Sequence, residues 1–118
     1  MKVHDSELKV MEILWENGDT SASEIAKLLK QQVNWSKTTT YTVIKKCVDK
    51  GIVERSGNRI FCRALITKDE VREQETMTLI EKLFEGAPDL LVANLLNSGK
   101  VSSEQLAKLR EQVLEEMK

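Results

Sequence analysis

The stretch NWSKTTTYTVIKKCV, residues 34–48, most constrains the fold of this chain. Taken residue by residue it favours a strand, because β-branched and aromatic residues are common in strands and mediocre in helices. Its periodicity favours a helix, because at 100° per residue five side chains share one arc and would form its inner face. These are Thr40, Val43, Ile44, Cys47 and Val48. We therefore predict a helix whose opposite face, rich in threonine and lysine, has another use.

Two further helices are predicted ahead of this one. Apolar residues at helical spacing indicate a first helix over residues 7–17, with Asp5 or Ser6 as its cap. A second, short helix starts at Ser21, which has capping-box spacing to a glutamate, and ends near Gln32. The order of these segments predicts a helical N-terminal region.

The third helix has clear boundaries, and a change of pattern follows it. Ser36 can cap its start, and Gly51 can end it with positive φ. The pattern then alternates every second residue on both sides of a turn at residues 56–58, which predicts a β-hairpin. A minimal third strand is expected at residues 20–21. Three helices followed by a hairpin is the order of a winged helix-turn-helix domain, whose third helix enters the DNA major groove.

Charge is distributed unevenly along the chain. The whole chain carries a net charge of −1, yet residues 27–63 hold nine basic and two acidic residues, a local charge of +7. Beyond residue 65 there are seven basic and eleven acidic residues, a net of −4. The first region could bind a polyanion, and the second would be repelled by it.

The chemistry of the exposed helix face fits duplex DNA. Threonine hydroxyls bind phosphates or base edges, threonine methyls contact the thymine methyl, and lysines bind phosphates or guanine. The alternative is that this face is only a solvated surface. The candidate DNA-binding residues, including one on the basic hairpin edge, are Ser36, Lys37, Thr38, Thr39, Tyr41, Thr42, Lys45, Lys46 and Arg59.

The remaining chain is predicted to form three helices that contain many leucines. Thr67 and Ser102 have capping-box spacing to Glu70 and Gln105, and residues 86–88, Gly-Ala-Pro, separate the first two helices. So few residues cannot bury these leucines alone, which favours a second subunit over an intramolecular cap on the hairpin. The candidate dimerisation residues are Leu83, Phe84, Leu91, Leu95, Leu106, Leu109 and Val113.

The predicted fold class is therefore mainly α with a small β-hairpin, divided into two domains. Residues 1–66 would form a winged helix-turn-helix DNA-binding domain, and residues 67–118 a helical dimerisation domain. The expected partners are double-stranded DNA and a second copy of the chain. A palindromic operator would match the two-fold symmetry of such a dimer.

Other classes of protein find little support. The single histidine, His4, is near the terminus and is expected to be solvated, and no cluster has the spacing of metal ligands. We expect no enzyme, catalytic residue, metal or cofactor, and free, partly buried thiols at Cys47 and Cys62. No segment approaches a membrane span, so a cytoplasmic protein is expected. The alternative function is a winged helix that binds only proteins, which predicts no affinity for duplex DNA.

The segment from Asp5 to Arg55, DSELKVMEILWENGDTSASEIAKLLKQQVNWSKTTTYTVIKKCVDKGIVER, resembles the N-terminal domain of the penicillinase repressor family. The shared features are Glu-x-x-Val-Met-x-x-x-Trp, Trp-Ser-x-x-Thr and Lys-Gly, and the resemblance continues through LFEGAPDLLVANLL and SSEQLAKLREQVLEE. It implies a dimeric bacterial repressor of a β-lactamase or cell-wall-stress operon, linked to antibiotic resistance. The residues that match the family's DNA-binding helix face are Thr38, Thr39, Tyr41, Thr42 and Lys45.

The resemblance also implies a mode of induction. Repressors of this family are inactivated when a membrane sensor protease system triggers cleavage of an Asn-Phe bond in the dimerisation region. The matching bond here joins Asn94 and Leu95, so a leucine stands where the family has phenylalanine.

Overall fold

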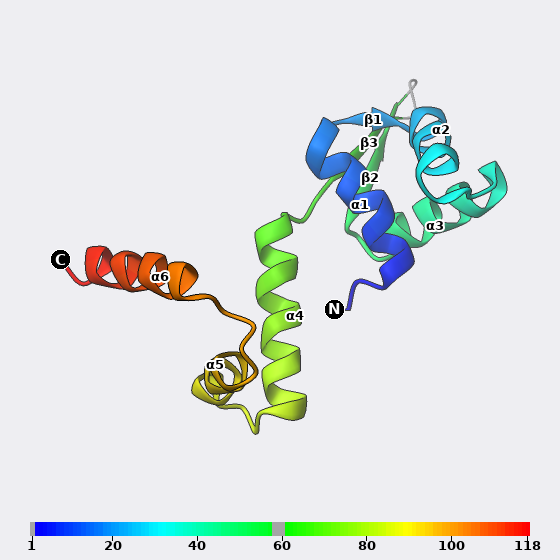
Figure 1. Ribbon diagram of the computed structural model, residues 1–118. Coiled ribbons are helices and arrows are strands. Elements are labelled where there is room, and N and C mark those ends of the chain that lie inside the picture. Colours follow the sequence, from blue (N-terminus) through cyan, green and yellow to red (C-terminus); the bar gives the residue numbers. More distant parts are fainter. Residues whose placement is uncertain (1, 58–60) are drawn as a thin grey trace. The chain divides into compact units, whose positions relative to one another are not determined.

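The computed structural model describes residues 2–57 and 61–118. It is mainly helical with one small antiparallel sheet, as the sequence predicts (Figure 1). The elements, in chain order, are α1 (Asp5–Asn17), β1 (Thr20–Ser21), α2 (Ala22–Val33), α3 (Lys37–Asp49), β2 (Val53–Ser56), β3 (Phe61–Ala64), α4 (Lys68–Leu83), α5 (Pro88–Asn97) and α6 (Ser103–Glu116).

The threonine-rich stretch is a helix, α3, as its periodicity predicts. Val43, Ile44 and Cys47 are buried on its inner face, together with Thr40. A threonine is tolerated there because the Thr40 hydroxyl donates a hydrogen bond to the Ser36 carbonyl at 3.3 Å. Gly51, with φ of +80°, lets the chain turn away after the helix.

The first helix begins earlier than the sequence predicts. Its first residue is Asp5 and its N-cap is His4, so the expectation that Asp5 or Ser6 is the cap was wrong. The physical reason is the side chain of Glu7, whose Oε1 accepts a hydrogen bond from the His4 backbone N–H at 2.8 Å. This bond satisfies a backbone donor that the helix itself leaves free.

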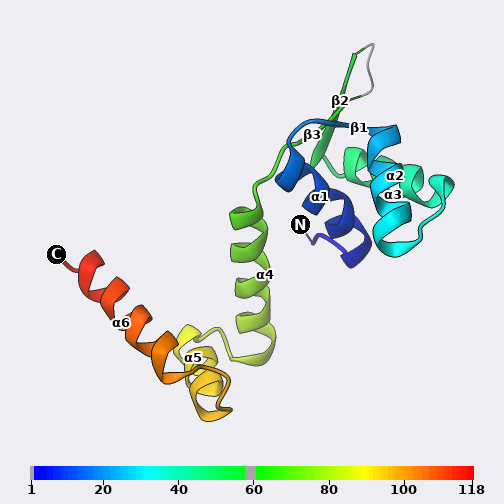
Figure 2. The ribbon, with the colours of Figure 1, turned by 45° about the horizontal axis from the view of Figure 1, so that its top comes forward.

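The three strands form one sheet in the order β1, β3, β2, with both pairs antiparallel. Thr20 of β1 is opposite Cys62 of β3, which confirms the predicted third strand. Figure 2 shows β1 alongside β3 in the sheet, and shows β2 and β3 as the hairpin that follows α3.

The core of the N-terminal part lies between these helices and the sheet. Its largest fully buried apolar side chains come from α1, α2 and α3, and both cysteines are free and fully buried, more deeply than expected. Trp35 packs against this core, and the indole N–H of Trp15 donates to the Ile66 carbonyl at 2.9 Å. The core therefore fixes one face of α3 and leaves the other face exposed.

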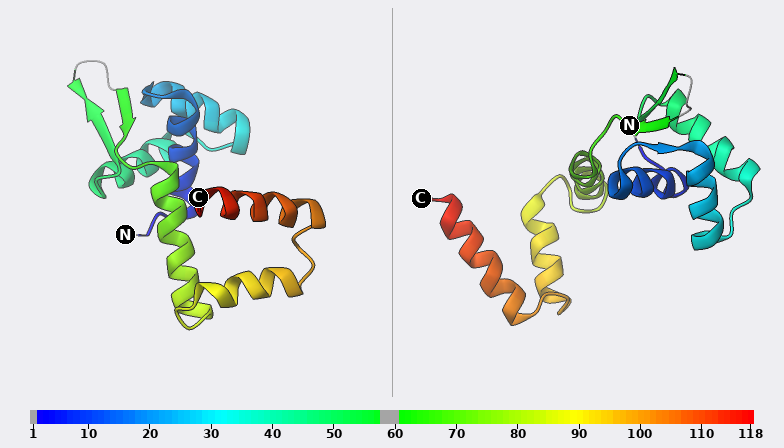
Figure 3. Two further views of the ribbon diagram at one scale, coloured as in Figure 1. Left: turned by 90° about the vertical axis from the view of Figure 1, so that its left-hand side faces the viewer. Right: turned by 90° about the horizontal axis from the view of Figure 1, so that it is seen from above.

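The chain divides into two compact units, Met1–Glu75 and Thr76–Lys118, so the division falls within α4. In the second unit, α5 and α6 are joined by a short connection (Figure 3). Every residue of α5 and α6 is described, and none is buried. Their exposed leucines include Leu90 at 41% and Leu109 at 51% of full exposure, an unusual surface for an isolated chain.

Candidate nucleic-acid interface

The interface is built on the exposed face of α3. Ser36 caps the helix, because its Oγ accepts a hydrogen bond from the Thr39 backbone N–H at 3.1 Å. The buried side of the helix holds it against the core, and the opposite side is open. The predicted contact residues on that open side are all exposed, and they are Thr38, Thr39, Tyr41, Thr42, Lys45 and Lys46.

The hydroxyls on this face differ in what they can offer a ligand. The Ser36 hydroxyl donates to Thr39 Oγ1 at 2.9 Å, so the Thr39 hydroxyl keeps its own proton for a phosphate or a base acceptor. The Thr42 hydroxyl donates to the Thr38 carbonyl at 2.9 Å. Thr42 therefore offers a methyl group and oxygen lone pairs.

The cations at the two ends of this face are held differently. The Lys37 ammonium lies over the ring of Tyr41, 5.7 Å from its centroid, in a cation–π contact that keeps the charge beside the helix. Lys45 pairs with Asp49 at 3.4 Å, but both side chains are more than half exposed, so the pair is weak and can rearrange. Among the described residues, no acidic side chain pairs with Lys46.

The hairpin formed by β2 and β3 also carries basic residues. Arg59 lies outside the described residues. In β3, Arg63 is directed toward Asp19, which its guanidinium approaches at 3.3 Å. In the neighbouring strand β2, the residue opposite Arg63 is Glu54. Arg55 of β2 is exposed, so the described part of the hairpin adds a basic side chain to the lysines of α3.

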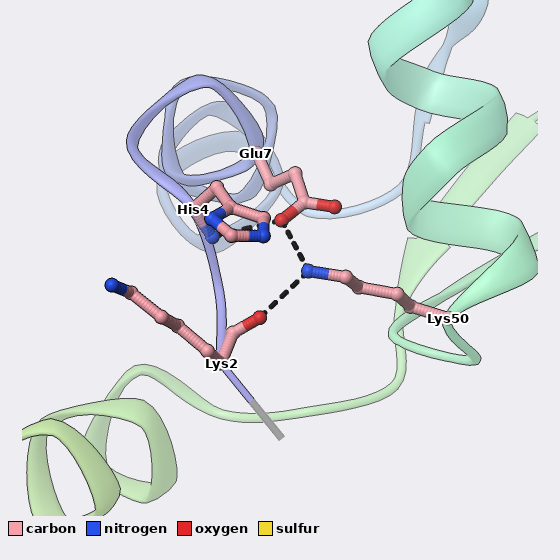
Figure 4. A network of polar contacts seen from close by, with 4 residues as sticks. All are labelled: Lys2, His4, Glu7 and Lys50. Carbon is pink, nitrogen blue, oxygen red and sulfur yellow. Dashed lines mark hydrogen bonds and ion pairs between the residues drawn. The ribbon is translucent and has the colours of Figure 1, made fainter. Parts of the chain in front are cut away.

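Two residues that the sequence does not single out for the site, Glu7 and Lys50, connect α1 to the end of α3. Lys50 is the C-cap of α3, and its ammonium donates to Glu7 Oε1 at 2.6 Å (Figure 4). A signal was present in the sequence, because Glu7 occupies the same helical stripe as Met11 and Leu14. An acidic residue on an apolar stripe indicates a buried partner.

The predicted dimerisation residues are all in the second unit. Leu83, Leu95, Leu106, Leu109 and Val113 are exposed, and Phe84 and Leu91 are half-buried. Asn94 and Leu95 are adjacent within α5, and both are exposed.

Within residues 2–57 and 61–118, no helix is long and apolar enough to cross a membrane. Over the same residues, no group of three histidine, cysteine, aspartate or glutamate side chains is arranged to hold a metal ion. The thiol of Cys47 is not a candidate nucleophile, because burial raises its pKa to about 12.

Three helices, a small sheet with a β-hairpin, and a third helix with an exposed hydroxyl and lysine face define a winged-helix DNA-binding protein. A family model described as "Penicillinase repressor" matches residues 3–115. The chain belongs to the penicillinase repressor family, which comprises transcriptional repressors and not enzymes.

Individual relatives agree with this family. The chain is 27% identical over 111 residues to the methicillin resistance regulatory protein MecI of Staphylococcus aureus strain N315, covering 92% of this chain and 90% of that protein. It is 25% identical over 119 residues to the penicillinase repressor of Bacillus licheniformis, covering 99% and 92% respectively. Among solved structures, a MarR family regulator from Neisseria meningitidis aligns with 98% of this chain and 81% of its own, with 17% identity and a TM-score of 0.42.

Proposed function

We propose that this repressor binds a palindromic DNA operator as a homodimer and controls a β-lactamase or cell-wall-stress operon. The observation that carries the proposal is the exposed face of α3, where hydroxyl and lysine side chains gather opposite a buried face that holds the helix in place. The names of the relatives support the class of operon.

The proposed dimer uses the second unit. All leucines of α5 and α6 except the half-buried Leu91 are exposed in the single chain, and burying them against a second copy would remove a large apolar surface from water. A two-fold dimer presents two copies of α3 to two inverted half-sites. Joining two weak sites in this way raises affinity by roughly 10²–10⁴ without any new contact.

The first test distinguishes sequence-specific recognition of bases from non-specific attraction between lysines and phosphates. Lys46→Ala is expected to weaken binding to all duplexes and to lower the slope of log K against log salt by about one unit, because one phosphate contact is lost. Thr39→Val keeps the shape but removes a hydroxyl, and should lose about 1 kcal/mol on a selected duplex and little on random DNA. Lys9→Ala removes an exposed lysine of α1 and serves as the matched control.

These effects can be measured by fluorescence anisotropy on a duplex that the chain selects from a random library, and on the unselected pool. Tyr41→Phe removes only the hydroxyl, and Tyr41→Ala also removes the ring that contacts Lys37. Comparing the two variants separates the contribution of the hydroxyl from that of the ring. Equal losses on selected and random DNA for every variant of the helix face would exclude a base-reading role for α3.

We also propose that induction proceeds through cleavage between Asn94 and Leu95. Both residues lie inside α5, so cleavage would divide this helix and separate α6 from the rest of the chain. The dimer would lose contacts and the two copies of α3 would separate, leaving each half-site weakly bound. A folded helix is a poor protease substrate, so we expect cleavage in locally opened or DNA-free protein.

Mass spectrometry of the chain from cells exposed to a β-lactam tests this proposal. Two fragments that divide between Asn94 and Leu95 are expected, with untreated cells as the control. Asn94→Ala should keep the chain intact and the operon repressed. An intact wild-type chain together with full derepression would exclude cleavage and leave the DNA-binding proposal unaffected.

A further inference from the structure

Among the described residues, Glu7 is the only charged side chain that is buried, at 1% of full exposure. A carboxylate in such a position is costly unless a cation and hydrogen bonds compensate it. Glu7 Oε1 accepts two hydrogen bonds, one from the Lys50 ammonium at 2.6 Å and one from the His4 backbone N–H at 2.8 Å. The buried charge therefore has a cation and a backbone donor as partners, both at Oε1.

Lys50 makes a second bond that extends this network. Its ammonium also donates to the Lys2 carbonyl at 2.6 Å, so one lysine joins the N-terminal segment and the first turn of α1 (Figure 4). The Lys50 backbone N–H donates to the Lys46 carbonyl at 3.0 Å, which ties the same residue to the last turn of α3. The network thus connects the end of the DNA-facing helix to the start of the domain.

Stability alone does not explain such a pair. Replacing a buried ion pair by apolar side chains of similar size is often neutral or stabilising, because two charges no longer have to leave water. Ionic hydrogen bonds differ from apolar contacts in being short and directional, so they hold two elements in one geometry. A helix that reads base edges needs such a defined geometry.

We infer that Glu7 and Lys50 form a positioning pair that holds the end of α3 against the first turn of α1 and so sets how accurately α3 reads DNA. Neither residue is proposed to contact DNA itself. The effect on DNA rests on the proposed function, whereas the effect on α3 itself does not.

The charge-neutral double variant Glu7→Leu/Lys50→Met tests the inference. It removes both charges together, so its melting temperature should stay close to that of the wild type. Backbone hydrogen exchange of residues 46–50 should become at least tenfold faster, with α2 unchanged. The ratio of affinities for a library-selected duplex and the random pool should fall about tenfold, while the salt slope stays the same because no phosphate contact is lost.

Two further variants complete the experiment. Glu7→Gln keeps the shape and an acceptor oxygen, so it should give a smaller change in the exchange rate of residues 46–50 and in the ratio of affinities. It replaces the double variant if that variant fails to fold. Asp69→Asn removes the acid of the exposed Arg72–Asp69 pair and should change neither readout. Unchanged exchange at residues 46–50 in a folded variant would overturn the inference. If the wild type prefers no duplex, the proposed function fails, and the exchange measurement alone decides the positioning role.

Discussion

A Leu95→Asp variant is expected to sediment as a folded monomer at micromolar concentration, whereas the wild type is expected to sediment as a dimer. Leu95 lies in the second half of α5 and is 40% exposed in the single chain. In the proposed dimer this side chain becomes buried, and a carboxylate there would be desolvated without a partner. The N-terminal unit has its own core and should keep its fold.

The consequence for DNA binding is larger than that for folding. Without the dimer, the gain of roughly 10²–10⁴ from linking two half-sites is lost, while affinity for a single half-site is retained. Asn97→Asp places the same charge on the same helix at a polar position and is the matched control. Analytical ultracentrifugation and titration of a selected duplex measure both effects. A folded, dimeric Leu95→Asp chain would place the interface elsewhere.

Lys50→Met alone is expected to destabilise the N-terminal unit by about 3–5 kcal/mol at pH 7, because it leaves the Glu7 carboxylate buried without its cation. Each kcal/mol corresponds to a fall in Tm of about 4–8 °C for a unit of this size. Lys46→Met makes the same substitution at an exposed lysine of the same helix and should change stability by about 0.5 kcal/mol or less.

The stability lost in Lys50→Met should depend on pH in a direction that follows from the pKa of Glu7. In the wild type, burial alone would raise the pKa of Glu7. The hydrogen bonds from Lys50 and the His4 backbone, with the nearby charges of Lys50 and His4, outweigh burial and lower it below 4.5. The stabilisation that the ionised Glu7 carboxylate provides is therefore fully present above pH 4.5 and is lost as pH falls through the lowered pKa.

In Lys50→Met, burial prevails and the pKa of Glu7 should rise. That variant is then penalised as pH rises above 4.5, so the difference in stability between it and the wild type should be largest near pH 7 and shrink toward pH 4. The neighbouring Cys47 thiol stays neutral throughout this range. Urea unfolding followed by tryptophan fluorescence measures the difference at each pH. A pH-independent difference would contradict the ionic origin of the effect.

The exposed and buried faces of α3 were predictable because helical periodicity is a local property. Thr40, Val43 and Ile44 recur at helical spacing, and this periodicity outweighs their individual preference for strands. The boundaries set by Ser36 and Gly51 were predictable for the same reason, since capping and positive φ depend on neighbours along the chain. The start of α1 was not, because it depends on which residues Glu7 binds.

The sequence by itself therefore determined the helices, the hairpin and the chemical character of the exposed face of α3. Only the tertiary structure decided that Glu7 meets Lys50, 43 residues further along the chain. It also decided which hydrogen bonds the hydroxyls of α3 make and that no leucine of α5 or α6 is buried. The physical reason is that periodicity and capping act within one or two helical turns, whereas a buried ion pair forms only when packing brings distant segments together and excludes water.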